Sequence, residues 1–392
     1  MMKVDFDAVI NRKHTDSYKW DSYKSGDGGT DPIPMWVADM DFECPPDVTA
    51  AIQKRAAHGI YGYTIRPPAY YTAILNWMRT RYDWAVDESW LAFCPPGIIP
   101  AVQALVRMLT RPGDEIAVHD PAYEPLAEVV LRNGRKLIRL PLDQKNNRFT
   151  MEMGALADRL SAKTRMLILC NPHNPTGRVW TRAELARLVE ICLTHDIFIV
   201  SDDIHADIVY SGHRYCPVGA VSPDAGKNTA TLYSPSKTFN LGGLQTSTVI
   251  IPDADIRQRF NEELKTAQIR LDNIFGQVAV EASYGHAGPW LDQLLAYLES
   301  NLELLLRFFD DRIPLIHVIP PEGTFLVWLD CRDLGLSGRD LERFFTEKAG
   351  VLLTPGGEFG DRWRGFMRMN FACPRSILTK ALKNIGQAVR AL

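Results

Sequence analysis

The sequence predicts an α/β fold in which a mostly parallel sheet is covered by helices on both faces. Apolar segments of strand length alternate with amphipathic helical segments from about residue 90 to residue 251. Parallel strands require crossover connections, so this alternation is typical of a doubly covered sheet. Polar residues directly follow several of these strands, at the sheet edge where ligands bind in such folds. A second, α+β pattern begins near residue 290 and indicates a smaller C-terminal module.

The composition is that of an ordinary globular protein and argues against several classes of function. At 392 residues the chain is long enough for two domains, and its net charge of −3 without Lys/Arg runs argues against a nucleic-acid partner. The longest apolar runs, such as 198–200 and 249–251, are far shorter than a membrane span, and no secretory signal is visible at the N-terminus. Seven scattered cysteines without CxxC or zinc-ligand spacing predict reduced thiols in the cytoplasm and no metal site.

The first part of the chain is predicted to form an N-terminal arm and two helices. Residues 1–45 lack periodicity and are rich in Asp, Pro, Trp and Tyr. Within them, PMWVADMDF either packs on the core as a hydrophobic arm or lines a pocket, with Trp36 facing the ligand. Helices are expected at 45–59, where Gly59 ends the pattern, and at 68–82.

The predicted sheet has seven strands, at 90–93, 115–119, 136–140, 165–170, 197–201, 229–233 and 246–251. The helices between them are expected at 101–109, 123–133, 152–160 and 181–195. Thr181 and Glu184 form a capping box at the start of the last of these helices. A Gly turn joins the first strand to its helix, an arrangement that aims free backbone N–H groups at an anion, although many such turns bind nothing.

Helical periodicity dominates from residue 254 to residue 311, and the smaller module follows. It is expected to contain a strand, a helix, the Gly-rich turn TPGGEFG, a second strand and a last helix, at 324–329, 339–348, 354–360, 366–371 and from 374 onward. We therefore expect an N-terminal arm (1–45) that belongs to the small domain and the site wall, a large domain (46–288) and a small C-terminal domain (289–392).

Four polar groups form a candidate site. They are an Asn in NPHNPTG (171–177), an Asp in SDDIH (201–205), Lys237 in SPSKTFNLGG and Arg368 in the last predicted strand. Alone, the segment around Lys237 fits either a surface turn or a Schiff-base lysine. Together, the four groups suit pyridoxal phosphate, which needs a lysine for its aldehyde, a carboxylate for its ring nitrogen and a donor for its phenolate oxygen. The planar fork of an arginine suits the carboxylate of an amino-acid substrate.

These motifs resemble those of fold-type I pyridoxal-phosphate enzymes, the aspartate-aminotransferase superfamily (class I/II). Within it, the chain is similar to the C–S lyases of the MalY/PatB type, the cystathionine β-lyases. The superfamily motifs are NPHNPTG, SDDIH, SPSK and RMNFACPR. The motifs shared with the lyases are PMWVADMDF, YGYT, PPGIIPA, DPAYEP, SKTFNLGGLQTS and GTFLVWLD, so the resemblance covers roughly residues 30 to 380.

The resemblance implies roles for five residues around the cofactor ring. Lys237 would bind the cofactor covalently and later move the Cα proton of the substrate, and Asp202 would pair with the ring nitrogen. Asn174 would donate to the phenolate oxygen, with His205 at the same edge of the ring. Tyr123 would stack on the ring face.

The resemblance also implies a phosphate site and a substrate site. The phosphate site would comprise Gly97, Ile98, Ser234, Ser236 and Tyr63. Because Tyr63 would come from the neighbouring subunit, the active form is expected to be a homodimer with shared sites. The substrate carboxylate would be held by Arg368, Asn174 and the backbone at Val37 and Ala38.

Two positions depart from the expected patterns. Aminotransferases of this superfamily usually carry an arginine eight residues after the lysine to grip the phosphate, whereas this chain has Gln245. The lyases also lack that arginine, so Gln245 favours elimination over transamination. Asp203 stands where the lyases more often have Glu, and we expect no functional consequence.

The implied function is α,β-elimination from cystathionine or a related S-substituted L-cysteine, in methionine and cysteine metabolism. The products would be a thiol (homocysteine from cystathionine), pyruvate and ammonia, and either Tyr123 or Lys237 would protonate the departing thiolate. The alternative is a class I/II aminotransferase. A non-catalytic pyridoxal-phosphate regulator is disfavoured, because no helix-turn-helix segment fits before residue 30 or after residue 380.

Overall fold

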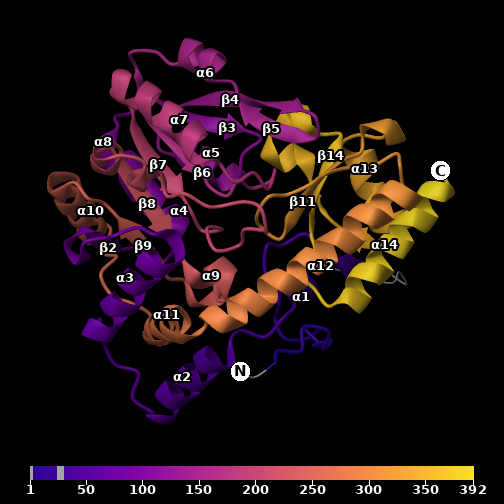
Figure 1. Cartoon of the computed structure of the whole chain (residues 1–392), viewed down its shortest axis with the longest axis horizontal. Coiled ribbons are helices and arrows are strands. Elements are labelled where there is room, and N and C mark those ends of the chain that lie inside the picture. Colours follow the sequence, from indigo (N-terminus) through magenta and orange to yellow (C-terminus); the bar gives the residue numbers. More distant parts are fainter. Residues whose placement is uncertain (1–2, 24–30) are drawn as a thin grey trace.

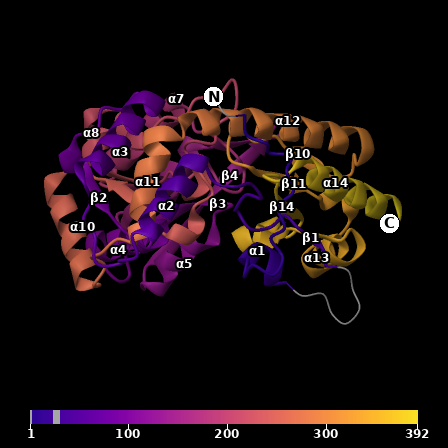
Figure 2. The same cartoon turned by 90° about the horizontal axis from the view of Figure 1, so that it is seen from below.

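The computed structural model describes residues 3–23 and 31–392 and has the predicted α/β architecture. Residues 1–2 and 24–30 of the expected N-terminal arm lie outside the described residues. In Figure 1 the large sheet and the helices around it lie on the left, and the C-terminal elements lie on the right. The long helix α12 (Gly288–Arg312) extends from the first part to the second. Figure 2 shows the same two-part arrangement from below.

The large sheet contains the seven expected strands and one more. Its order is β2-β9-β8-β7-β6-β3-β4-β5. The strands are β2 (Leu91–Phe93), β3 (Glu115–Asp120), β4 (Lys136–Lys145), β5 (Arg148–Met151), β6 (Thr164–Cys170), β7 (Phe198–Asp202), β8 (Thr229–Tyr233) and β9 (Thr248–Ile250). The central pairs β4-β3-β6-β7-β8 are parallel, and the remaining pairs are antiparallel.

The additional strand β5 arises because β4 runs past its predicted end at residue 140 and folds back in a hairpin. Asn146 and Asn147 form the turn, with φ angles of 52° and 56°. Turns with positive φ angles at both central residues match the twist of hairpin strands, and Asn adopts such angles more readily than most residues. Two consecutive asparagines were therefore the sequence signal for this hairpin.

Helices cover both faces of the sheet, as its apolar strands predict. They are α2 (Pro46–Ala57), α3 (Pro68–Tyr82), α4 (Ile98–Leu109), α5 (Glu124–Arg132), α6 (Met153–Arg159), α7 (Arg182–Thr194), α8 (Pro223–Lys227), α9 (Pro235–Thr238), α10 (Ala254–Thr266) and α11 (Ile274–His286). Alternate residues of β3 enter different cores: Ile116 and Val118 pack with α4, α5 and α10, whereas Ala117 packs with α6 and α7. The capping box of Thr181 and Glu184 is present at α7.

The C-terminal module is built on an antiparallel sheet of order β10-β11-β14-β13. Its elements are β10 (His317–Ile319), β11 (Leu326–Asp330), β12 (Val351–Leu352), β13 (Thr354–Pro355), β14 (Phe366–Asn370), α13 (Arg339–Arg343) and α14 (Arg375–Arg390). The arm contributes α1 (Tyr18–Asp21) and β1 (Ile33–Pro34), and β1 pairs in parallel with β12. The N-terminal arm thus joins the C-terminal module, although the two are more than 300 residues apart in the chain.

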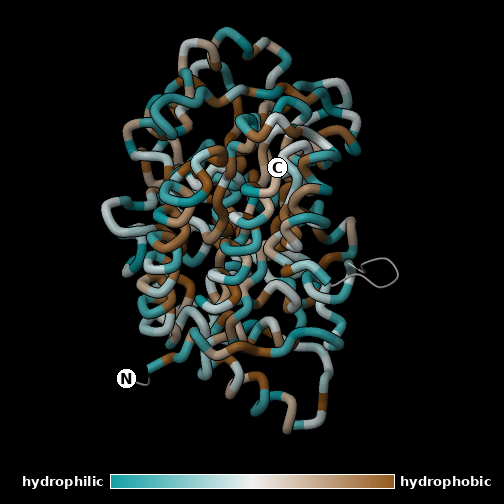
Figure 3. The backbone as a smooth tube through the Cα atoms, turned by 90° about the vertical axis from the view of Figure 1, so that its right-hand side faces the viewer, coloured by the Kyte–Doolittle hydropathy of each residue, from teal (hydrophilic) through white to brown (hydrophobic). Residues whose placement is uncertain are grey.

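Hydrophobic segments gather toward the interior and hydrophilic ones toward the outside (Figure 3). Among the helices of residues 3–23 and 31–392, none combines the length and apolar character needed to cross a membrane.

Candidate active site

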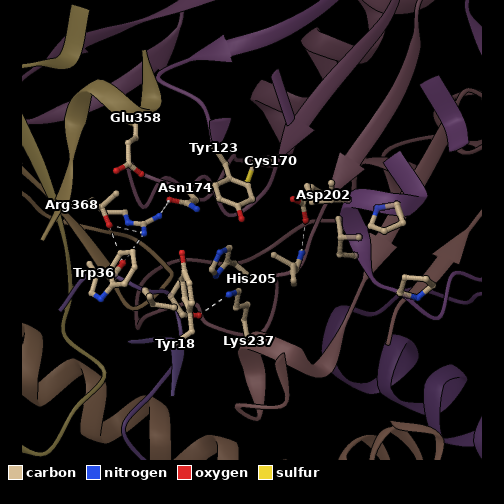
Figure 4. A pocket seen from close by; sticks show the side chains of 18 residues that line it. Tyr18, Trp36, Tyr123, Cys170, Asn174, Asp202, His205, Lys237, Glu358 and Arg368 are labelled. Carbon is tan, nitrogen blue, oxygen red and sulfur yellow. Dashed lines mark hydrogen bonds between the residues drawn. The ribbon is translucent and has the colours of Figure 1, made fainter. Parts of the chain in front are cut away.

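A cavity of about 380 Å³ lies where the large sheet, the N-terminal arm and the C-terminal module meet. Most of the predicted site residues line it: Val37, Ala38, Ile98, Tyr123, Asn174, Asp202, His205, Lys237 and Arg368. Figure 4 shows their side chains converging from separate parts of the fold. The remaining predicted residues (Gly97, Ser234, Ser236 and Tyr63) are not among those that line the cavity.

Lys237 lies on the short helix α9, directly after β8. Ser234 caps this helix by accepting a hydrogen bond from the backbone N–H of Ser236. The Lys237 Nζ atom donates to the carbonyl oxygen of Ala38 at 2.6 Å, so the arm and the lysine meet in the cavity. Burial, together with the positive charge of Arg368, lowers the pKa of Lys237 to about 8. Its neutral amine, the form that acts as nucleophile or base, is therefore accessible at mildly alkaline pH.

Asp202 is the last residue of β7, and its side chain is only 4% exposed. Its Oδ1 atom accepts one hydrogen bond, from the backbone N–H of Ile204 at 3.2 Å. Burial raises the pKa of Asp202 to about 6, an effect opposed by the Ile204 hydrogen bond and by Lys237. A cationic partner placed against this buried carboxylate would stabilise its ionised form, which has only one hydrogen bond from the protein.

Arg368 and Asn174 form a connected polar pair at the opposite end of the cavity. Arg368 Nη1 donates to Asn174 Oδ1 at 3.1 Å, and Arg368 Nη2 donates to the Trp36 carbonyl at 2.8 Å and to Thr354 Oγ1 at 3.0 Å. The Arg368 Nε atom is buried without a hydrogen-bond partner among the described residues. All the acceptors of Arg368 are neutral, so the buried guanidinium is available to a carboxylate from a ligand.

His205 and Tyr123 add two groups that stay uncharged at neutral pH. His205 is buried, and its Nδ1 atom has no hydrogen-bond partner in the described part of the chain. Burial and then the cations Lys237 and Arg368 hold the pKa of His205 well below its usual value. Burial raises the pKa of Tyr123, which keeps its hydroxyl protonated beside the cavity. Both side chains can therefore exchange hydrogen bonds with a ligand without changing the site's charge.

The N-terminus of α4 forms an anion-binding end of the cavity. Gly97 precedes the helix with a φ of 115°, and a Cβ atom there would meet nothing within 4 Å. The N–H of Gly97 already donates to Cys94, so the free donors are the first-turn N–H groups of Ile98 and Ile99, which line the cavity. The hydroxyls of Ser234 and Ser236 instead bond to each other at 2.5 Å.

Besides several apolar residues and Cys170, the sequence prediction missed three cavity residues that carry a side-chain oxygen: Tyr18, Thr354 and Glu358. Thr354 reaches the site because β13 pairs with β14 in a register that places it opposite Arg368. Glu358 lies in the turn after β13, within a Gly-rich segment in which the sequence indicated only a turn. Their approach to the site depends on strand register and on the packing of the arm, and neither is visible in local sequence patterns.

A buried carboxylate, Asp207, holds the lysine-bearing helix from behind. It accepts hydrogen bonds from Trp77 Nε1 at 2.9 Å, from the Tyr82 hydroxyl at 2.5 Å and from Thr238 Oγ1 at 2.7 Å. Trp77 and Tyr82 belong to α3, and Thr238 follows Lys237. Asp207 therefore ties α9 to α3. The neighbouring Asp203 accepts from Ser201 and Tyr215, and burial raises its pKa to about 8.

Replacing Asp207 by alanine is expected to lower the free energy of unfolding by about 3 kcal/mol, because three buried donors lose their acceptor. Urea unfolding measures this loss. Asp292 gives the matched control, since it also contacts α3, through an exposed ion pair with Arg81 at 2.8 Å. The Asp292→Ala change should alter stability by no more than about 0.5 kcal/mol. Equal effects of the two changes would contradict the anchoring role of Asp207.

The donor set of this cavity fits pyridoxal phosphate. The unpartnered His205 Nδ1 atom and the singly bonded carboxylate of Asp202 lie near the buried amine of Lys237. Free helix N–H groups at Ile98 and Ile99 suit a phosphate. A lysine, a carboxylate and an anion cradle are the groups that this cofactor requires.

Comparisons with known proteins agree with this chemistry. The family model for aminotransferases of class I and II matches residues 30–385. The chain is 38% identical to cystathionine β-lyase PatB of Bacillus subtilis, over 98% of this chain and all of PatB. It is 31% identical to the protein MalY of Escherichia coli, over 99% of each chain. It also superposes on cystalysin from Treponema denticola, whose crystal structure contains pyridoxal 5′-phosphate, with a TM-score of 0.96, 32% identity and full coverage of both chains. The chain therefore belongs to the aminotransferase class I and II family.

Proposed function

We propose that this protein is a pyridoxal-phosphate-dependent C–S β-lyase. It cleaves cystathionine or related S-substituted L-cysteines to a thiol, pyruvate and ammonia. The observation that carries the proposal is the meeting of Lys237, Asp202 and Arg368 in one cavity, with an amine, a carboxylate and a guanidinium for the cofactor and the substrate. The similarity to PatB, a cystathionine β-lyase, supports elimination as the reaction.

The residues of the cavity divide between cofactor and substrate. Lys237, Asp202 and the N-terminus of α4, which line the cavity, would hold the cofactor by its aldehyde, its ring nitrogen and its phosphate. The Oδ1 atom of Asn174 accepts from Arg368, which orients the amide. Its Nδ2 group, which has no acceptor among the described residues, would donate to the phenolate oxygen. Arg368 binds the α-carboxylate of the substrate with its guanidinium, which orients the Cα–H bond toward Lys237.

When bound, the cofactor withdraws electrons from the substrate Cα, so that the Cα proton becomes acidic and a group on Cβ can leave. The neutral amine of Lys237 removes that proton, and its pKa of about 8 suits this step near neutral pH. Asp202 holds a proton on the ring nitrogen. The C–S bond then breaks with its electron pair on sulfur, and a proton from Tyr123 or from the Lys237 ammonium completes the thiol. Water releases pyruvate and ammonia from the remaining fragment.

The proposal is tested with purified, cofactor-loaded protein and a series of cysteine thioethers. We expect free thiol to appear from each cleaved thioether, while the visible spectrum of the cofactor returns to its starting form after turnover. An aminotransferase would instead convert the cofactor stably to its amine form with an amino acid alone. The exposed Gln245, in place of an arginine, favours the first outcome. Stable conversion without thiol release would reject the lyase proposal.

We further propose a homodimer in which Tyr63 completes the phosphate site of the other subunit. Tyr63 is 93% exposed, and its neighbours Ile60 and Ile65 are 66% and 83% exposed. A contiguous exposed apolar stretch is typical of an interface. On this proposal the cavity of one chain lacks one of its phosphate donors until a second chain binds.

Mixed dimers test this arrangement. The Tyr63→Ala change should weaken binding of pyridoxal phosphate about tenfold, since one hydrogen bond to a charged phosphate is lost. Mixing Tyr63→Ala chains with Lys237→Ala chains should restore sites of full affinity and activity, because one site of each mixed dimer has both residues intact. A monomer in sedimentation experiments, or no complementation between the two variants, would contradict the shared site.

A further inference from the structure

Glu358 is the charged residue of the cavity to which the proposed chemistry gives no role. The charged side chains lining the cavity are Asp202, Lys237, Arg368 and Glu358. The first two serve the cofactor, and Arg368 serves the α-carboxylate of the substrate. Glu358 lies in the turn Gly356–Phe359 of the C-terminal module, and Figure 4 shows its carboxylate beside Arg368, at the end of the cavity farthest from Asp202.

Glu358 and Arg368 interact electrostatically, but no hydrogen bond or ion pair joins them among the described residues. Arg368 donates only to the neutral oxygens of Asn174, Trp36 and Thr354. Within the part of the chain that the structure describes, Glu358 forms no hydrogen bond or ion pair, and its side chain remains open to solvent. The cavity therefore presents a cation and, beside it, an anion, and in the described part of the chain neither is hydrogen-bonded to a group of opposite charge.

The arrangement of these two charges affects which thioethers can bind in the cavity. Once the α-carboxylate of the substrate neutralises Arg368, the carboxylate of Glu358 is left facing the rest of the substrate. A charge on the wall of a cleft attracts an opposite charge more strongly than it would on an open surface. Glu358 is exposed, yet partial burial of its carboxylate raises its pKa, an effect that the charge of Arg368 opposes. A cation placed against this carboxylate would stabilise its ionised form.

We propose that Glu358 selects thioethers whose leaving group carries an ammonium group. This inference rests on the proposed function and narrows its substrate class to S-(aminoalkyl)-cysteines, a class that includes cystathionine. A simpler role for Glu358 would be to reduce the positive electrostatic potential around Arg368. In that case removing the carboxylate would change the binding of all cysteine thioethers alike, whatever their leaving group.

Two nearly isosteric substrates separate these roles. S-(2-aminoethyl)-L-cysteine carries an ammonium group where S-propyl-L-cysteine carries a methyl group. We expect Glu358→Gln to lower kcat/KM for the aminoethyl substrate about fivefold and to leave that for the propyl substrate within about twofold. The preference of the unchanged enzyme should also shrink at high salt, because the attraction is electrostatic.

Asp361 provides the matched control. It lies three residues after Glu358, is 90% exposed and pairs with Arg364 at 2.7 Å, outside the cavity. The Asp361→Asn change removes the same charge from the same segment and should leave the substrate preference unchanged. A preference retained in Glu358→Gln, or lost equally in Asp361→Asn, would overturn the inference.

A binding measurement keeps this result separate from the proposed function. Cofactor-loaded Lys237→Ala protein binds substrates without turning them over, and its visible spectrum reports their affinity. The aminoethyl compound should bind about fivefold more tightly than the propyl compound to Lys237→Ala, and equally to Lys237→Ala/Glu358→Gln. If no thioether is cleaved by the unchanged enzyme, the lyase proposal fails while this comparison still decides the role of Glu358. Equal binding of both compounds to Lys237→Ala would overturn the inference.

Discussion

Replacing Lys237 by alanine is expected to lower kcat for thiol release by at least about 10³-fold, because the Cα proton loses its acceptor. The same change should abolish covalent attachment of the cofactor to the chain. Lys237 is the lysine whose Nζ lies in the cavity with Asp202, and burial has already lowered its pKa to about 8. Borohydride reduction followed by peptide mass spectrometry measures the attachment, and a coupled pyruvate assay measures the rate.

A lysine outside the cavity provides the control for this experiment. Lys265 is exposed and pairs with Glu262 at 2.7 Å on α10. Lys265→Ala should keep both the covalent attachment and the rate. Attachment that survives in Lys237→Ala and maps to another lysine would contradict the assigned role of Lys237.

Replacing Asp202 by asparagine is expected to lower kcat by about 10²–10³-fold, similar to the loss of a charge-stabilising group in other active sites. Without the carboxylate, the ring nitrogen of the cofactor is no longer held protonated, so the ring accepts electrons from Cα less well. The affinity for pyridoxal phosphate should also fall, since a buried ionic contact is lost. Steady-state kinetics and a cofactor titration followed by absorbance measure the two effects.

The stability of the cofactor-free protein separates this effect from misfolding. Burial raises the pKa of Asp202 from 3.8 to about 6, so the folded protein binds this proton more tightly than the unfolded chain does. The resulting stabilisation is complete below pH 3.8 and is lost as the pH rises through about 6. Above that pH the ionised carboxylate costs about 3 kcal/mol. Cofactor-free Asp202→Asn should therefore be at least as stable as the unchanged protein at pH 8 in urea unfolding. A markedly less stable variant would contradict this account of the carboxylate.

Much of the large sheet and its helices could be predicted because the patterns that indicate them are local. The predicted strands of the large sheet contain short apolar runs, and the helices between them show a period of 3.6 residues. Asn174 and Asp202 could be placed together because Asn174 follows β6, Asp202 ends β7, and the two strands are parallel neighbours in the sheet. The hairpin β4–β5 was missed because the antiparallel extension of β4 lies beyond the end of its apolar run.

The rest of the site depends on contacts between distant parts of the chain. Lys237 bonds to the carbonyl of Ala38, 199 residues away, and Arg368 bonds to that of Trp36, 332 residues away. The sequence left open whether PMWVADMDF packs on the core or lines a pocket, and the structure shows both: Met35 is buried, whereas Val37 lines the cavity. Glu358 enters the cavity through a turn whose direction is set by the pairing of β13 with β14. Composition and periodicity carry no information about such long-range contacts.

The product balance with L-cystathionine tests the central claim most directly. Purified enzyme loaded with pyridoxal phosphate is incubated with L-cystathionine, and pyruvate, ammonia and homocysteine are measured together over time, without an added keto acid. The elimination mechanism predicts equal amounts of the three products over many turnovers. Consumption of no more than one cystathionine per active site, with the cofactor left in its amine form and no homocysteine released, would contradict it.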